Sequence, residues 1–146
     1  MAVRIVRARR LAVGIALSGL ALLVSAGPGG APLGSRQAEA AGFVVTTLAN
    51  SDPSSLRQAI TNANATPGFD AITFALSGTI TLALPQPPVS DPAGVLIDGT
   101  GRMVTLDGGH RTWMLPVASG AIATVQGLSF VRSNNSAIFN NGTVAV

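Results

Sequence analysis

The residues of this chain that are best suited to chemistry lie together in the segment Asp107-Gly108-Gly109-His110-Arg111. Carboxylate, imidazole and guanidinium groups can move protons and stabilise developing charge, so Asp107, His110 and Arg111 form a candidate catalytic centre for a lyase or hydrolase. Glycoside hydrolysis uses two carboxylates, yet no Asp or Glu follows Asp107 in the sequence. We therefore expect Asp107 to bond its own turn, and catalysis at these three residues is the alternative.

Three other residues are candidates for binding. The spacing of Asp70 and Asp91 suits one turn of a repetitive fold, where they could stack as oxygen ligands for calcium, although we favour solvated loop positions for both. Trp113 could stack on a sugar ring, but its apolar neighbours favour core or half-buried packing. His110 has no second histidine or cysteine beside it for a transition-metal site, and no cofactor is predicted.

The elements that would position these residues repeat along the chain. Segments of the form Gly-x-apolar-x-apolar begin at Gly78, Gly120 and Gly142, and the first separation is close to twice the second. These separations approximate two periods and one period of about 21 residues, which is typical of stacked supersecondary units. The sequence therefore predicts a solenoid, in which Asp98 and Asp107, less than half a period apart, lie on different sides.

One helix and a series of short strands are predicted. The β-branched run at 43–48 indicates a first strand. Asp52 as N-cap, Pro53 at the first helical position and apolar residues at 56, 59, 60 and 63 indicate an amphipathic helix. From Ala71 onward the chain reads as strands and turns, with no room for crossover helices. We expect an all-β parallel β-helix, with an N-terminal cap of one strand and one helix at 41–70 and coils at 71–146.

The basic residues are concentrated at the N-terminus. Four arginines within the first ten residues precede the uncharged apolar stretch 11–26, which is the layout of a secretory signal. Cleavage is expected after Ala40, in the small-x-small sequence Ala38-Glu39-Ala40, or else after Ala26. An uncleaved anchor is disfavoured because Gly27-Pro28-Gly29-Gly30 would break its helix. Residues 1–40 are therefore predicted to be a signal peptide, which is the chain's only expected membrane contact.

The charge and the cysteine content of the predicted mature chain exclude two classes of protein. Although the whole chain carries a formal charge of +3, residues 41–146 hold four arginines, five aspartates and no lysine. A nucleic-acid-binding role needs clustered basic residues, so it is excluded. The absence of cysteine excludes a disulfide-stapled domain, and the fold must be held by burial and backbone pairing.

Several segments share the pattern of a known family; these are 45–49, 52–60, 62–64, 67–74 and 77–80. They resemble the N-terminal region of secreted bacterial right-handed parallel β-helix proteins that carry a Cys-Ser-Leu-Arg-Glu-Ala-type motif and are similar to polymorphic outer membrane proteins. Ser54 stands where that motif has cysteine and Gln58 where it has glutamate, so only the helix-capping role carries over. The resemblance implies the right-handed pectin-lyase-like fold and a cell-surface setting, and it implies no reaction.

These observations lead to one expected function and two alternatives. We expect a secreted or cell-surface β-helix with a structural or adhesive role, whose partners are surface polysaccharide or other β-helix chains. The first alternative is a polysaccharide lyase or glycoside hydrolase of the same fold. The second is an inactive fragment of a longer surface protein, because the segment 142–146 reads as the start of a strand and we expect the coils to be incomplete there.

Overall fold

The computed structural model describes residues 40–111 and 113–146. These residues belong to one compact unit. Except for Ala40, the predicted signal peptide lies outside the described residues.

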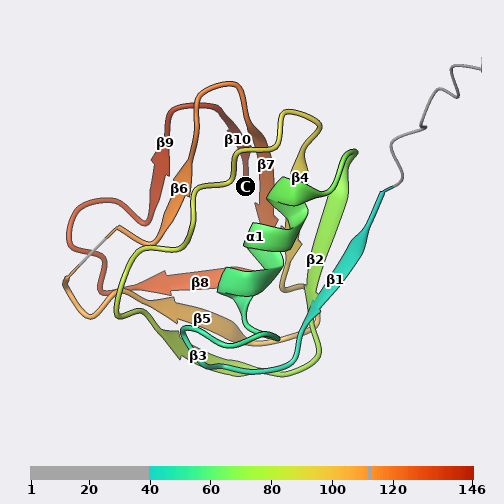
Figure 1. Cartoon of the computed structure of the whole chain (residues 1–146). Helices are drawn as coiled ribbons and strands as arrows, with labels where there is room; N and C mark the ends of the chain where they lie inside the picture. The colour runs from blue at the N-terminus through green and yellow to red at the C-terminus, as the bar shows by residue number, and fades with distance from the viewer. Residues whose placement is uncertain (1–39, 112) are drawn as a thin grey trace, which may run out of the picture. The chain divides into compact units, whose positions relative to one another are not determined.

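The described chain folds as a parallel β-solenoid of about four turns, as predicted, and Figure 1 looks along its axis. The strands form three sheets. Sheet A contains, in spatial order, β1 (Gly42–Val45), β2 (Asp70–Phe74), β4 (Val95–Asp98), β7 (Ile122–Gln126) and β10 (Thr143–Ala145). Sheet B contains β3 (Gly78–Thr81), β5 (Val104–Asp107) and β8 (Leu128–Val131), and sheet C contains β6 (Leu115–Val117) and β9 (Ile138–Asn140).

Each coil of the chain passes through sheets A, B and C in that order. The first coil has no regular strand in sheet C, but its segment 84–90 lies there. Val89 forms a parallel bridge with Val117, and the backbone nitrogens of Gln86 and Val89 donate to the carbonyls of Met114 and Pro116 at 3.0 and 2.9 Å. Segment 84–90 therefore continues sheet C by one rung.

The coils differ in length, which corrects the single period predicted from the glycines. Successive sheet A strands pair Asp70 with Val95 and Val95 with Ala123, so both of these steps are longer than the predicted period. The step from Ile122 to Thr143 agrees with it. Gly78 begins a strand of sheet B, so its spacing to the later glycines, which precede strands of sheet A, was not two periods.

The core follows from alternation along each strand. In β2, Ile72 and Phe74 are buried while Thr73 is exposed, because successive side chains of a strand point to opposite faces. Parallel pairing in register then stacks the inward residues of successive coils. Ile72, Ile97 and Val125 form one such column in sheet A, and all three are nearly inaccessible to solvent.

Helix α1 (Leu56–Ala65) connects the parallel strands β1 and β2 and lies across the interior of the solenoid in Figure 1. Its predicted apolar stripe is confirmed: the buried residues are Leu56, Ala59, Ile60 and Ala63. The predicted N-cap was wrong, because Ser55 caps the helix by accepting from the backbone nitrogen of Gln58. The hydroxyl of Ser55 also donates to the carbonyl of Asp52 at 2.7 Å, so residues 52–55 form a turn before the helix. No helix of the described residues is long and apolar enough to cross a membrane.

The stacked columns make a testable prediction about stability. Ile97 is fully buried in β4, whereas Ile122 of the next sheet A strand is 44% exposed. We expect Ile97→Ala to lower the free energy of unfolding by about 2–5 kcal/mol, because it opens a cavity between two coils. Ile122→Ala is the matched control and should cost less than about 1 kcal/mol. Urea unfolding followed by circular dichroism measures both, and equal losses would contradict the assigned strand faces.

Candidate ligand-binding site

The predicted catalytic cluster is organised around an ion pair. Asp107, the last residue of β5, is buried, and its Oδ1 accepts from the backbone nitrogen of Gly109 at 3.0 Å. Its carboxylate also binds Arg132, with Nε donating to Oδ1 at 2.8 Å and Nη2 donating to Oδ2. Since Asp107 pairs with Val131 in register, this ion pair joins the ends of two stacked strands. The turn role expected for Asp107 is therefore present, together with a bond between coils.

These contacts fix the charge of Asp107. The Arg132 guanidinium, followed by the Gly109 amide, holds the pKa of Asp107 below its usual value, and the pKa of Arg132 is raised in return. An ionised carboxylate with both oxygens engaged is a poor general acid or base at neutral pH. His110 and Arg111 are exposed on the following turn, and the nearest aspartate in sequence, Asp98, ends a strand of sheet A and pairs with Gln126. Asp98 and Asp107 thus belong to different sheets, as expected.

Asp70 and Asp91 are buried, which corrects the expectation of solvated loop positions. Each carboxylate accepts a backbone hydrogen bond: Oδ1 of Asp70 from Ala41 at 2.9 Å, and Oδ1 of Asp91 from Ala93 at 2.8 Å. The register places Asp70 opposite Val95, four positions beyond Asp91, so the two aspartates are not stacked. No group of three or more potential metal ligands occurs among the residues described in the structure.

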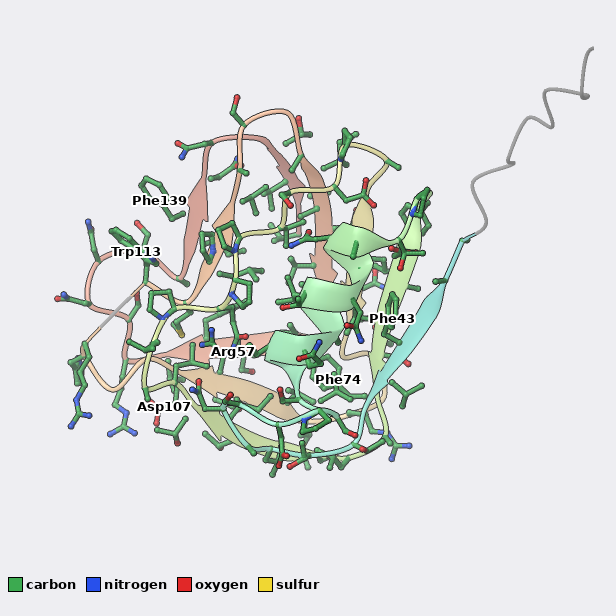
Figure 2. All side chains as sticks on the ribbon, in the orientation of Figure 1. Phe43, Arg57, Phe74, Asp107, Trp113 and Phe139 are labelled. Carbon is green, nitrogen blue, oxygen red and sulfur yellow. The ribbon has the colours of Figure 1, made fainter. Side chains whose placement is uncertain are left out.

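Trp113 is half-buried and packed against another ring, which is the second of the two packed positions expected for it. Its ring stacks on that of Phe139 from the next coil, with centroids 5.1 Å apart and planes inclined by 20°. The two side chains are 42% and 40% exposed, and Figure 2 shows both beside sheet C, on the side of the solenoid away from sheet A. Phe139 was not singled out from the sequence, although its position between Ile138 and Asn140 in a short strand was a signal for an outward aromatic.

Two hollows adjoin the aromatic pair. The larger, of about 430 Å³, is lined by both rings, by the apolar residues Pro85, Pro88, Pro116, Val117 and Ala118, and by the polar residues Gln86, Ser119 and Asn141.

The smaller hollow, of about 320 Å³, is lined by Pro85, Arg111, Trp113, Asn134 and Asn135. Because Pro85 and Trp113 line both hollows, the two depressions adjoin each other at Trp113. We call the two hollows together the sheet C groove.

Helix α1 holds one wall of the sheet C groove in place. The Nη2 of Arg57 donates to the carbonyls of Leu84 and Pro85, at 3.2 and 2.7 Å. Asn64 donates to the carbonyl of Pro88 at 2.8 Å and accepts from the backbone nitrogen of Ser90 at 2.9 Å. Hydrogen bonds from the polar face of α1 thus hold the proline-containing segment 84–90 of the first coil in position.

The sheet C groove is suited to binding rather than to bond cleavage. Proline rings give a rigid apolar wall without backbone donors, and the stacked aromatics offer a flat apolar plate. Arg111 and the neighbouring asparagines supply hydrogen-bond donors and acceptors. No carboxylate is among the residues that line either hollow.

Comparison of the chain with protein-family models, with curated proteins and with solved structures found no match.

The Asp107–Arg132 ion pair predicts a pH-dependent stability. The pKa of Asp107 is lowered in the folded state, so its contribution is present above the unfolded-state pKa of about 3.9 and is lost as the pH falls through the folded value. We expect Asp107→Asn to lower the urea midpoint at pH 7 and to approach the parent protein at pH 3. Asp52→Asn, at an exposed aspartate, is the control and should leave the pH 7 midpoint nearly unchanged. If the urea midpoints of Asp107→Asn and the parent protein differed equally at pH 7 and pH 3, the role of charge would be contradicted.

Proposed function

We propose that the chain is an exported β-helix protein of the cell surface or extracellular space, with an adhesive role, and that it binds an extended polysaccharide in the sheet C groove. Export is supported by the basic N-terminal residues, the apolar stretch 11–26 and the small-x-small sequence before Ala41. The resemblance to secreted β-helix surface proteins supports the same setting. The observation that carries the binding role is the half-exposed stack of Trp113 on Phe139.

A saccharide fits the chemistry of the groove. Sugar rings have apolar C–H faces, which stack on aromatic rings, and hydroxyl edges, which need hydrogen-bond partners. The groove offers the stacked rings for the faces, and Asn134, Asn135 and Asn141 for the edges. Exposed aromatic rings cost free energy in water, so two of them held together on the surface favour a binding role.

The form of the groove favours a polymer. Trp113 lies between two depressions, so a ligand that stacks on it can extend into both. The groove is formed on the outer face of sheet C, whereas another β-helix chain would be expected to pair with a strand edge. Among the expected partners, polysaccharide is therefore the one we propose.

Binding without cleavage is favoured by the state of the candidate acid. Asp107 is ionised and bound to Arg132, and neither hollow is lined by a carboxylate. A glycosidase needs a protonated acid and a second carboxylate beside the scissile bond. A lyase or hydrolase would have to act through His110 and Arg111 without a pair of carboxylates.

The proposal can be tested by tryptophan fluorescence, because Trp113 is the only tryptophan of the chain. We expect at least one polymer among a neutral glucan, a mannan and polygalacturonate to shift its emission and to retard the protein in affinity electrophoresis. Trp113→Ala should weaken the retardation by about tenfold or more, as truncation of an aromatic anchor commonly does. Met103→Ala removes another exposed apolar side chain, from the residue before β5, and should bind normally.

Two results would contradict this proposal. The first is the absence of both signals with all three polymers, and the second is unaltered retardation of Trp113→Ala. Release of new reducing or unsaturated ends from a polymer would instead favour the enzymatic alternative, particularly if Asp107→Ala abolished it.

A further inference from the structure

The N-terminal edge of sheet A contains a carboxylate that lacks a partner. Asp70 is 0% exposed, and although its Oδ1 accepts from the backbone nitrogen of Ala41 at 2.9 Å, its Oδ2 is buried without any hydrogen bond. The ion pair found among the described residues joins Asp107 to Arg132, so none of their cations neutralises Asp70. Burial of a carboxylate is unfavourable unless it is paired and hydrogen-bonded. Among the described residues, the Oδ2 of Asp70 therefore lacks a positively charged donor.

Strand pairing holds the nitrogen of Ala41 at this carboxylate. The carbonyl of Ala41 accepts from the backbone nitrogen of Ala71 at 2.9 Å, and the next residue, Gly42, begins β1 and pairs with Ala71. Ala40, directly before, is exposed. The Ala40–Ala41 bond is also the one that follows the small-x-small sequence recognised by signal-removing peptidases. A sequence signal and a buried acceptor thus converge on one peptide bond.

We propose that hydrolysis of the Ala40–Ala41 bond completes this site, because the new α-ammonium group of Ala41 forms a buried ion pair with Asp70 and fastens β1 to β2. In the cleavage, the oxygen of water bonds to the acyl carbon of Ala40, which leaves as a carboxylate. The nitrogen of Ala41 receives both protons of that water and becomes an ammonium group at neutral pH. One amide donor is replaced by three donors with a positive charge, which is enough to serve both oxygens of Asp70.

The ion pair would couple processing to the stability of the N-terminal cap. Strand β1 is one of the two edge strands of sheet A, and helix α1 packs against β1 and β2. In the uncleaved chain the amide of Ala41 offers Asp70 one neutral donor. Cleavage after Ala26 instead would place the amine at Gly27, well before β1 in the sequence, and leave Asp70 as it is. The inference rests on the export proposed above and is independent of polysaccharide binding.

The first experiment identifies the processed N-terminus. The full chain is expressed in an exporting bacterium, and the intact mass of the recovered protein is measured. We expect a chain that starts at Ala41. A retained leader would contradict export itself, and a start at Gly27 would contradict the proposed ion pair alone.

The second experiment measures the reactivity of the α-amine on that processed protein. Because the chain has no lysine, an amine-acetylating reagent modifies only the N-terminus among aliphatic amines. Pairing with a carboxylate holds the proton on the amine, and each unit of increase in its pKa lowers the reactive fraction about tenfold. We therefore expect acetylation at pH 7 to be about tenfold slower in the folded protein than in urea.

Two variants separate the ion pair from general burial of the amine. Asp70→Asn should remove most of the protection. Asp91→Asn is the matched control, since Asp91 is also buried, has an unpartnered Oδ2 and accepts only a local backbone bond, and it should keep the protection. If Asp70→Asn does not fold, the acetylated parent protein serves instead, and its urea midpoint should fall below that of the unmodified protein. Equal acetylation rates in folded and unfolded protein, or a midpoint unchanged by acetylation, would overturn the ion pair.

Discussion

Parallel, in-register pairing between successive coils is the constraint on which the rest of this structure depends. The backbone groups of each strand form hydrogen bonds with the preceding and the following coil. The same pairing stacks apolar side chains in columns, such as Ile72, Ile97 and Val125. Each coil is then stabilised mainly by its neighbours. At the N-terminal end of the stack no preceding coil covers the apolar core. Helix α1 covers it by burying one apolar stripe against the first coil.

Much of the variation between the coils lies in their corners, because paired strands must stay in register. Residues 108–111 with 113–114, and the segment at 132–137, lie between sheet B and sheet C in successive coils, and they carry Arg111, Trp113, Asn134 and Asn135. Asp107 and Arg132 bind each other where these two corners begin. The proposed binding groove therefore combines irregular segments with residues of the regular strands β6 and β9 that hold them.

The sequence predicted what local patterns determine and missed what depends on neighbours from other coils. The apolar stripe of α1 follows from helical periodicity, the solenoid from a succession of short strands and turns without crossover helices, and the turn role of Asp107 from residue type. The choice of Ser55 over Asp52 as N-cap, the burial of Asp70 and the contact of Trp113 with Phe139 depend on which residues lie one coil away. Coil length varies, so a single period read from the glycines could not supply that register.

The sheet C groove is shared by three successive coils: Pro85 and Pro88 come from the first, Trp113 and Pro116 from the second, and Phe139 from the third. In a stack stabilised by nearest neighbours, the first and third coils have little direct means of influencing each other. A polymer lying in the groove would contact all three and would add a coupling that the polypeptide lacks. With a polymer bound in the groove, the solenoid would resist pulling along its axis as one unit. With the groove empty, its coils would unfold one at a time. An adhesive surface protein with this design would thus grow mechanically stronger when it holds its ligand.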